Sequence, residues 1–485
     1  MSDERKAPTL IHALTPIATL IALLAVNVVV FGSGATDGPN QIALFLAAGV
    51  AAVVAFSLGY QWDEIEQSMI RSISSAMGAM LILLVIGALS GTWLMSGIVP
   101  SMIYYGLKIL NPTIFLVAAC LVCCVVSLAT GSSWSTIATV GIALLGIGKA
   151  LNIHEGVIAG AIISGAYFGD KMSPLSDTTN LAPAMAGTDL FTHVKYMMIT
   201  TIPTLTISLI IFLVWGFTLD TAAVGTDTQS VLDSIDKAFN LNPVLFVVPV
   251  LVILMILRKV PALPALLVGS LLGGIAAIIF QPDIVAGISG VTGSPIKSAF
   301  VAVMKAMSGS INIQTDNAMI SELLSSSGMA GMLNTIWLIL GAMVFGGVME
   351  SCGLLKRIVQ EIIKLAHSTG SLVASTAVTC VFFNLTAGDQ YMAIAVPGRM
   401  FSDIYKRRGL KPELLSRTLE DAGTVTSVLI PWNTCGATQA KVLGVATMSY
   451  FPYCFFCLLS PLTTVVVAML NYKIRRTDES QSEPS

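Results

Sequence analysis

Acidic and hydroxyl side chains interrupt an apolar stretch between Gly165 and Pro183, whose sequence is GAYFGDKMSPLSDTTNLAP. Two carboxylates, Asp170 and Asp177, lie on either side of Pro174. A carboxylate at mid-bilayer depth costs roughly 2.5–3.5 kcal/mol on insertion scales, so an acid here needs a cation, a proton or a polar cavity. Proline removes a backbone donor, and nearby hydroxyl and amide groups can bond the freed peptide groups. The pattern predicts a membrane helix that is broken around an ion site.

A similar pattern occurs in the second half of the chain. The stretch LIPWNTCGA, Leu429–Ala437, again places a proline, an asparagine and a threonine within an apolar run. Upstream of each proline lies a polar interruption that contains a glycine, TGSSWST at 130–136 and NLTAGDQ at 384–390. A loop that merely joins two spans would explain the first stretch alone, but the second copy argues against that alternative.

The two copies share one register. Pro174 and Pro431 are 257 positions apart (431 − 174), and so are Gly131 and Gly388 (388 − 131). This spacing indicates a duplicated unit. Duplicated halves with polar breaks in matching positions are typical of secondary transporters, which bind substrate near mid-membrane between the repeats.

The composition excludes several classes of protein. Of the 485 residues, 55% are hydrophobic and only 11% are charged, whereas soluble domains carry about 25% charged residues. The chain is therefore predicted to be a polytopic membrane protein. The net charge of −2 and the lack of a basic, aromatic-interleaved patch argue against nucleic-acid binding. The eight cysteines lie in apolar runs without partner histidines, which favours a packing role over metal or redox chemistry.

The predicted fold is all-α, with two inverted-topology repeats that each contain a re-entrant hairpin and a broken transmembrane helix. Apolar windows of about twenty residues predict membrane spans near 12–32, 41–58, 74–96, 198–217, 242–258, 262–280, 331–350 and 453–472. The expected hairpins cover 112–147 and 371–401, and the expected broken helices cover 156–190 and 418–448. Long outer loops are expected at 220–240 and 281–329.

Basic residues set the expected orientation. With both termini in the cytoplasm, most Lys and Arg residues, including Arg258, Lys259 and Arg417, fall on the inner side, as the positive-inside rule requires. The predicted division is an N-terminal transmembrane helix (1–40), a first repeat (41–217), an outer linker and connecting helix (218–261), a second repeat (262–472) and a cytoplasmic tail (473–485).

Sodium ions and protons both prefer hard oxygen ligands, and one carboxylate can hold either but not both. This competition is sufficient for antiport. Asp177 is the first candidate because it follows the break at Pro174 among hydroxyl groups, and Asp389 in the second hairpin is the next. Sodium is expected at Asp177, Asn180 and Asp389.

Further polar residues are expected to form or support the ion site. The first motif adds Asp170, Ser173, Ser176, Thr178 and Thr179; the hairpins and the second break add Thr130, Ser132, Ser133, Ser135, Thr136, Thr386, Gln390, Asn433 and Thr434; and Glu350 is a further candidate acid.

Other acids have competing interpretations. Asp170 could form a structural ion pair with Lys171, although adjacent residues do not face each other on a helix. Glu420 and Asp421 are expected to stabilise the positive end of a helix. Glu350 could instead reach the inner surface.

The segment GDKMSPLSDTTNLAP, Gly169–Pro183, with its continuation to Met197, resembles the NhaC family of sodium/proton antiporters. That family includes relatives that exchange malate and protons for sodium and lactate. The stretch GDQYMAIAVPGRMF, Gly388–Phe401, is similar to the same family. The resemblance implies a homodimer with a scaffold domain and a mobile transport domain. It also implies ion-site roles for Asp170, Ser173, Ser176, Asp177, Thr178, Thr179, Asn180, Asp389 and Gln390.

These observations predict an antiporter that exchanges cytoplasmic sodium for external protons across a bacterial inner membrane. The alternative is a sodium- and proton-coupled exchanger of small organic acids. A passive channel is disfavoured by the duplication and the acidic site, and an enzyme by the lack of a nucleophile–base constellation, metal-ligand spacing or phosphate-binding loop. The expected partners are sodium ions, protons, membrane lipid and a second copy of the chain, with no cofactor beyond the transported ions.

Overall fold

The structure is a computed structural model that describes residues 5–31, 34–35, 37–109, 111–219, 224–315, 321 and 324–477. Within these residues, nine helices are long and apolar enough to cross a membrane, or up to eleven crossings if two bent helix pairs each form one span. Two short strands, β1 (Ile311–Asn312) and β2 (Ser325–Ser326), form the one sheet found in this part of the chain. The protein is therefore an all-α, multi-pass membrane protein, as the composition predicts.

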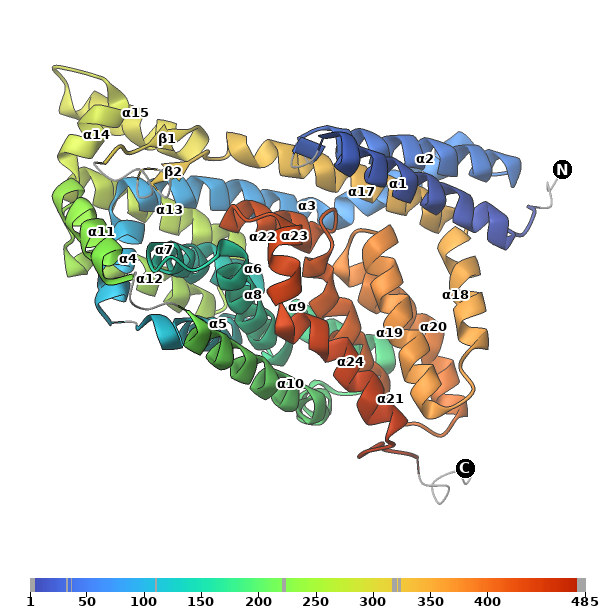
Figure 1. The fold of residues 1–485 in the computed structure, drawn as a ribbon. Coiled ribbons are helices and arrows are strands. Elements are labelled where there is room, and N and C mark those ends of the chain that lie inside the picture. The colour runs from blue at the N-terminus through green and yellow to red at the C-terminus, as the bar shows by residue number, and fades with distance from the viewer. Residues whose placement is uncertain are drawn as a thin grey trace.

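Four long helices form one layer of the molecule. They are α1 (Leu10–Phe31), α2 (Pro39–Ser57), α3 (Trp62–Met95) and α17 (Leu333–Ser351), and they run side by side across the top of Figure 1. The alanine-rich face of α2 is buried, which lets its neighbours approach closely. Helix α3 begins well before the predicted residue 74 because a capping box between Gln61 and Glu64 starts the helix at a polar segment.

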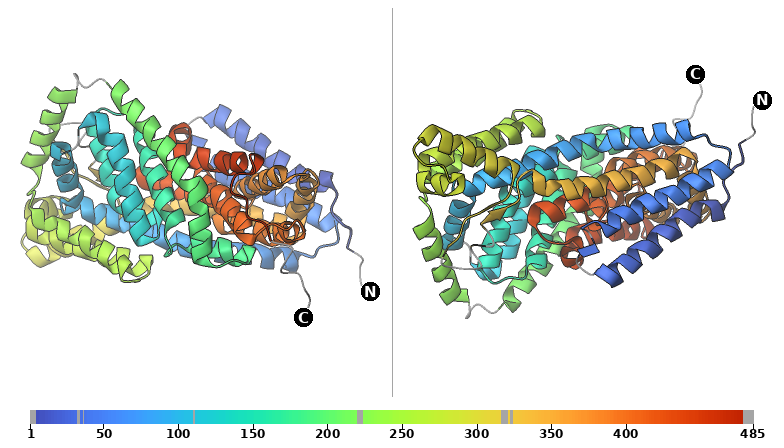
Figure 2. Two further views of the ribbon diagram at one scale, coloured as in Figure 1. Left: turned by 90° about the horizontal axis from the view of Figure 1, so that it is seen from below. Right: turned by 90° about the horizontal axis from the view of Figure 1, so that it is seen from above.

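A second layer contains the helices that carry the polar interruptions. It includes α5 (Pro112–Thr130), α8 (Glu155–Met172), α10 (Leu190–Thr218), α19 (Thr369–Thr386), α20 (Gln390–Arg407), α21 (Pro412–Leu419) and α24 (Phe455–Met469). Figure 1 shows this layer below the first, and the left view of Figure 2, seen from below, shows it in front. Gly165 brings α8 against the backbone of α5, since a Cβ there would lie 2.1 Å from the Cys120 carbonyl oxygen. Small residues allow such close helix contacts in membrane proteins, where hydrophobicity alone does not drive helices together.

The order of elements repeats along the chain. Helices α3 and α4 (Ile98–Ile109) correspond to α17 and α18 (Leu354–Lys364), followed in each half by a helical hairpin, a broken helix and a long helix. Gly97 and Gly353, with φ of 80° and 68°, precede α4 and α18, and Pro203 and Pro461 lie inside α10 and α24. The order of elements is thus alike in the two halves, while the duplication and the inverted orientation of the halves stay predictions.

Both predicted hairpins are present. In the first, α5 ends at Thr130, and the chain turns at Gly131 into α6 (Ser133–Thr136), the π-helical η2 (Ile137–Gly141) and α7 (Ile142–Ala150). In the second, α19 ends at Thr386 and α20 begins at Gln390. The turn glycines have φ of 71° and 67°, a left-handed conformation that residues with a Cβ adopt only with strain.

Both predicted breaks are also present. Helix α8 ends at Met172, and α9 (Asp177–Ala186) begins after a turn in which the Ser176 N–H donates to the Ser173 carbonyl oxygen at 3.1 Å. Helix α21 continues as the π-helical η5 (Glu420–Thr424) and the short η6 (Ser427–Leu429), and α22 (Thr434–Leu443) begins after the second break. Asn433 caps α22 by accepting the Cys435 N–H at 3.0 Å.

The predicted outer loops contain more regular structure than expected. The first contains α11 (Val224–Ala238), although residues 220–223 lie outside the described residues. The second contains α14 (Pro282–Ser289) and α15 (Pro295–Ser308), each with a proline in its first turn, before the β1–β2 pair. The other elements are η3 (Pro243–Phe246), α12 (Val247–Leu257), α13 (Ala262–Phe280), η4 (Ala330–Met332), α23 (Thr447–Tyr450) and η7 (Phe451–Tyr453).

Candidate functional site

Each hairpin turn contacts the break of the adjoining helix. A Cβ on Gly131 would lie 2.6 Å from the Leu175 Cβ atom, so the first turn packs directly on the first break. At the second turn, the Thr434 N–H donates a hydrogen bond to the Gly388 carbonyl oxygen at 2.8 Å. The fold therefore brings polar segments far apart in sequence into contact.

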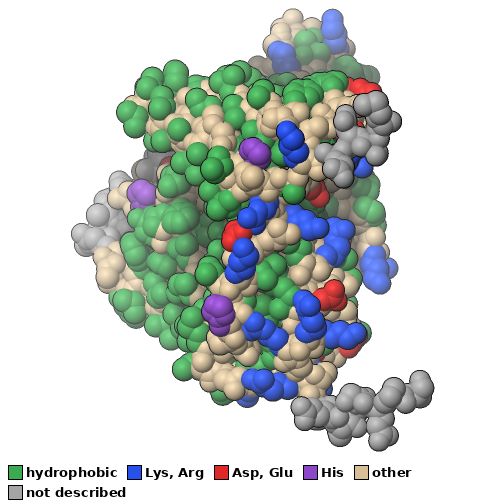
Figure 3. Space-filling view, turned by 90° about the vertical axis from the view of Figure 1, so that its right-hand side faces the viewer, with side chains coloured by type: hydrophobic (Ala, Val, Ile, Leu, Met, Phe, Trp, Pro, Cys, Tyr) green, Lys and Arg blue, Asp and Glu red, His purple; other side chains and the backbone are tan. Residues whose placement is uncertain are grey.

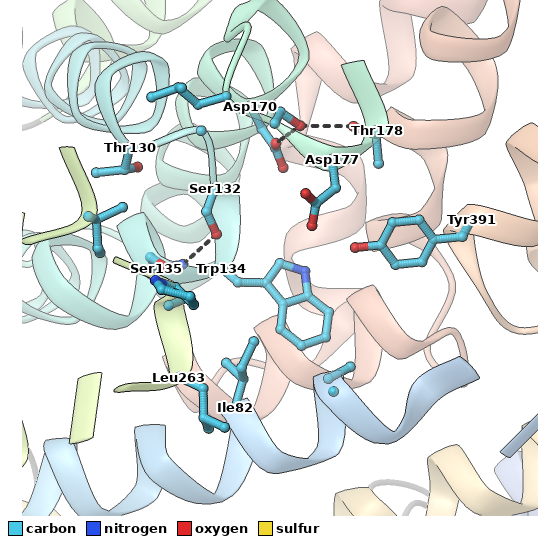
Figure 4. Close-up of a pocket in the computed structure, with 18 of the residues that line it drawn as sticks. Ile82, Thr130, Ser132, Trp134, Ser135, Asp170, Asp177, Thr178, Leu263 and Tyr391 are labelled. Atoms are coloured by element: carbon cyan, nitrogen blue, oxygen red, sulfur yellow. Dashed lines mark hydrogen bonds between the residues drawn. The ribbon is translucent and has the colours of Figure 1, made fainter. Parts of the chain in front are cut away.

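A cavity of about 780 Å³ lies where these segments meet. Its walls come from both hairpin turns, both breaks, α3 and the turn between α12 and α13, and Figure 4 shows part of it. The predicted site residues that line it are Thr130, Ser132, Ser135, Asp170, Ser176, Asp177, Thr178, Asp389, Gln390 and Thr434. Three carboxylates therefore share one cavity, which is an arrangement suited to binding cations.

Asp170 is the most firmly held of these acids. Its Oδ2 accepts hydrogen bonds from the Ser133 Oγ at 2.6 Å and the Ser133 N–H at 3.2 Å, and its Oδ1 accepts from the Ser176 Oγ at 2.6 Å. The side chain is buried. Three donors directed at one carboxyl group stabilise its ionised form, and they tie the first hairpin to the first break.

Asp177 differs from Asp170 in having a free carboxylate. It begins α9 and points into the cavity, where Figure 4 shows Tyr391 directed toward it from α20 on the opposite wall. Within the described part of the chain its carboxylate has no hydrogen bond or ion pair, and its side chain is exposed. A cation that enters the cavity can therefore bind to Asp177 without first displacing a protein donor.

Asp389 has both a structural contact and a place in the cavity wall. Its Oδ1 accepts the Met392 N–H at 3.0 Å and caps α20. The neighbouring Gln390 uses its Oε1 to accept from the Ser427 Oγ at 3.2 Å and from the Cys435 thiol at 3.0 Å. The second hairpin thus contributes one carboxylate and one amide to the cavity, both held by groups of their own repeat.

Several predicted site residues stabilise the first break rather than line the cavity. The Asn180 amide donates to the carbonyl oxygens of Pro174 and Ser176, at 2.9 and 2.7 Å. The Thr179 hydroxyl is within 3.0 Å of the Asp170 carbonyl oxygen and within 2.9 Å of that of Lys171, while the Ser173 Oγ accepts the Leu175 N–H at 3.3 Å. Asn180, expected as a sodium ligand, instead bonds backbone carbonyls of the break, and the Thr179 hydroxyl bonds the Asp170 carbonyl, which lies four residues before the proline.

The remaining predicted residues lie beside the cavity or far from it. Ser133 contacts it only through Asp170, and the hydroxyls of Thr136 and Thr386 donate to the carbonyls of Ser132 and Phe382. The Asn433 amide donates to Asn384. Glu350 is exposed at the end of α17 and is not part of the cavity wall, in agreement with the alternative that it reaches a surface.

Sequence reasoning missed three large side chains of the cavity wall, namely Trp134, Lys259 and Tyr391. Trp134 belongs to the first polar interruption and Tyr391 directly follows Gln390. Their positions in or next to the polar motifs could have identified both as residues of the cavity wall. Lys259 was assigned to the inner surface. It has a φ of 65° in the turn between α12 and α13, and its position on the cavity is a result of tertiary packing.

Lys171 pairs with Asp421, not with its neighbour Asp170. The Lys171 ammonium bonds to the Asp421 Oδ1, and both side chains are fully buried. Ser460 and Thr200 complete the contacts, with the Lys171 Nζ 3.0 Å from the Ser460 Oγ and the Thr200 Oγ1 2.8 Å from the Asp421 Oδ2. The pair joins the two broken helices, because Lys171 lies on α8 and Asp421 on η5.

Two further expectations about this region are wrong. Glu420 and Asp421 do not cap a helix, because α21 begins at Pro412 and continues directly into η5. Arg417 is not at the inner surface but is fully buried, with its Nε 3.9 Å from the Asp421 Oδ2 and its guanidinium over the Tyr196 ring. A lysine and an aspartate in separate apolar runs indicate that each has a buried partner of opposite charge. The sequence does not show which residue that partner is.

Asp170→Asn should stop exchange and also lower the melting temperature. The substitution replaces a carboxylate oxygen with an amide that cannot accept from the Ser133 or Ser176 donors. Sodium-dependent proton movement in proteoliposomes and thermal unfolding in detergent would measure the two effects. Normal exchange in this variant would show that Asp170 is not part of the transport site.

The fold and this acidic cavity define a multi-pass membrane protein with the architecture of a secondary transporter. Residues 165–472 match the sequence profile of the Na+/H+ antiporter family, and the chain belongs to that family. It is 37% identical over 430 residues to the Na(+)/H(+) antiporter NhaC of Alkalihalophilus pseudofirmus, covering 89% of this chain and 90% of that protein.

Two other relatives are named as antiporters of organic molecules. The chain is 36% identical to the malate-2H(+)/Na(+)-lactate antiporter of Bacillus subtilis, covering 93% of this chain and 92% of that protein. It is 34% identical to the arginine/ornithine antiporter ArcD of Halobacterium salinarum, covering 99% of this chain and 96% of that protein. The family resemblance seen in the sequence is confirmed.

Proposed function

We propose that this protein is a secondary active antiporter that exchanges cytoplasmic sodium ions for external protons. The observation that carries the proposal is the convergence of Asp170, Asp177 and Asp389 on one cavity between the hairpins and the breaks. A carboxylate in such a site binds either a proton or a sodium ion. If the empty site does not reorient across the membrane, this competition couples the two flows.

The proposed ion site uses Asp177 and Asp389 as the exchanged carboxylates, with Asp170 as the third acid. Hydroxyl groups of Ser132, Ser135, Ser176 and Thr178 line the same cavity and supply the neutral oxygen ligands that a partly dehydrated sodium ion needs. Among the described residues no group of three or more His, Cys, Asp or Glu side chains has metal-binding geometry. In the proposed exchange, sodium is a transported substrate.

A proteoliposome assay tests the function directly. An imposed sodium gradient should move protons in the opposite direction and change the fluorescence of a trapped pH dye at some pH between about 6 and 9. Liposomes without protein and a potassium gradient are the controls. If sodium moves no protons at any pH in that range, the proposed exchange is refuted.

Exchange of small organic acids is a second candidate. It is favoured by the similarity to the malate-2H(+)/Na(+)-lactate antiporter and by a cavity whose 780 Å³ exceeds the needs of a sodium ion and whose wall contains Lys259. Melting temperatures in the presence of sodium, lithium, malate and lactate would separate the candidates, since a bound ligand stabilises the folded state. Stabilisation by malate or lactate, with transport of either, would favour this alternative.

The proposed setting is a bacterial inner membrane with both termini in the cytoplasm. The two chain ends lie toward the same side in Figure 1, and the face in Figure 3 carries many Lys and Arg side chains. This agrees with the positive-inside rule. The repeat boundaries at 41–217 and 262–472, contact with lipid through the exposed apolar side chains of α1, and assembly as a homodimer are parts of the same proposal.

A further inference from the structure

Glu420 is a fully buried carboxyl group that the transport cavity does not use. It lies at the start of η5, has no exposed surface and is not part of the cavity wall. The Thr424 hydroxyl lies beside the carboxyl group, and neither carboxyl oxygen has an ion pair or any other hydrogen-bond partner among the described residues. Because an unpaired ionised carboxylate in an apolar environment is very costly, such a group binds a proton.

The charged neighbours of Glu420 leave it without a counter-ion. The positive charge of Lys171 on α8 acts on Glu420, but that ammonium is already bonded to Asp421. Asp170 on α8 and Asp421 on η5 add negative charge near Glu420. Cys380 on α19 is the titratable group facing it from the hairpin. The negative charge of Asp170 and Asp421 therefore favours the protonated form of Glu420.

Two further groups complete the surroundings of Asp421. Arg417 is fully buried and all three of its guanidinium nitrogens lack hydrogen-bond partners, and the His193 Nδ1 is 2.8 Å from the Ser416 Oγ while its Nε2 is unpartnered. Arg417 lies on α21 and His193 on α10, and both are near Asp421. Several buried polar atoms in this region therefore have no hydrogen-bond partner among the described residues.

We propose that Glu420 is a second proton-binding site of the antiporter, separate from the acids that compete directly for sodium. The inference rests on the proposed sodium/proton exchange. When sodium binds beside Asp170, its positive charge offsets a negative charge that acts on Glu420, so the ionised form of Glu420 becomes more favourable and the proton leaves. Sodium binding then releases one proton by competition in the cavity and a further proton by electrostatic coupling to Glu420.

Counting the protons released when sodium binds tests this proposal. Purified protein in weakly buffered detergent solution would be titrated with sodium chloride while a pH indicator reports proton release and calorimetry reports sodium binding. We expect Glu420→Gln to lower the number of protons released per sodium ion by up to one, and we expect Glu420→Asp, which keeps a carboxyl group, to release nearly as many as the wild type. Glu361→Gln, on the exposed face of α18, is the matched control.

The outcomes distinguish the proposal from the function on which it rests. If the wild type releases no protons on binding sodium, the proposed exchange fails and the second site fails with it. If the wild type releases protons and Glu420→Gln releases the same number, exchange stands and the second site is refuted. In proteoliposomes, the proton gradient at which sodium-driven proton movement reverses direction reports the number of protons exchanged per sodium ion. We expect that number to be lower in Glu420→Gln.

A second measurement applies if Glu420→Gln does not fold. Sodium-induced infrared difference spectra of the wild type and Glu420→Asp report protonated carboxyl groups directly. We expect sodium to remove a protonated-carboxyl band that shifts in frequency in Glu420→Asp. If no band in the sodium difference spectrum depends on the residue at position 420, the proposal is overturned.

Discussion

Asp177→Asn should reduce sodium/proton exchange to the background of empty liposomes while leaving the melting temperature unchanged. The carboxylate points into the cavity and has no hydrogen bond or ion pair within the described part of the chain, so the substitution removes no stabilising contact. It does remove a group that can take up a proton and bind a sodium ion with its full negative charge. Sodium-driven proton movement and thermal unfolding would be measured on the same preparation.

Asn180→Ala is the control for that experiment. Asn180 lies three residues further along α9, but its amide bonds the break and does not line the cavity. This variant should lower the melting temperature and retain sodium dependence in whatever protein remains folded. The opposite pattern, with normal exchange in Asp177→Asn and loss of sodium dependence in Asn180→Ala, would move the ion site from the cavity wall into the break.

Breaking the Lys171–Asp421 pair should have the largest effect on stability. Both side chains are fully buried, and removing one partner of a buried pair leaves an uncompensated charge that costs about 3–5 kcal/mol. Asp421→Leu, which leaves both Lys171 and Arg417 without their counter-charge, should therefore lower the free energy of unfolding by roughly that amount, and Lys171→Met by less, because Arg417 stays 3.9 Å from Asp421. Unfolding of the purified protein in mixed detergents would measure it.

The double variant and an exposed pair complete the test. Lys171→Met combined with Asp421→Leu also removes the ammonium that Asp421→Leu leaves unpaired, so it should be more stable than Asp421→Leu alone, although Arg417 loses its counter-charge in both. Substituting Lys364, whose Nζ lies 2.9 Å from the Glu361 Oε2 at an exposed site, should leave stability nearly unchanged. Additive losses in the double variant would mean that the two side chains do not stabilise each other.

The hairpins and breaks could be predicted because backbone chemistry marks them locally. A proline within an apolar run, followed by hydroxyl and amide side chains, predicts a break, and a glycine within a polar interruption predicts a turn. The matching spacing of Pro174 with Pro431 and of Gly131 with Gly388 then predicts a duplication, and the structure has the same order of elements in both halves. The helix in the first outer loop was missed because its sequence is too polar for a span, although Val231 and Ile235 recur at helical spacing and are buried.

Individual contacts within the site could not be predicted with the same success. Asp170, Asp177 and Asp389 were all selected from their places in the motifs, and all three line the cavity. Asn180 belongs to the same motif, yet its amide bonds backbone carbonyls of the break. Sequence alone does not separate ligands from supports, because both roles require the same polar side chains near the same proline.

By itself, the sequence determined that this is a helical membrane protein built from two similar halves, each with a hairpin and a broken helix. Those features depend on hydropathy, on proline and glycine geometry, and on spacing along the chain. Only the tertiary structure decided that Lys171 bonds to Asp421, that Lys259 lies on the cavity and that Glu420 is buried without an ion pair among the described residues. Such contacts depend on how helices distant in sequence are packed and rotated, which no local pattern specifies.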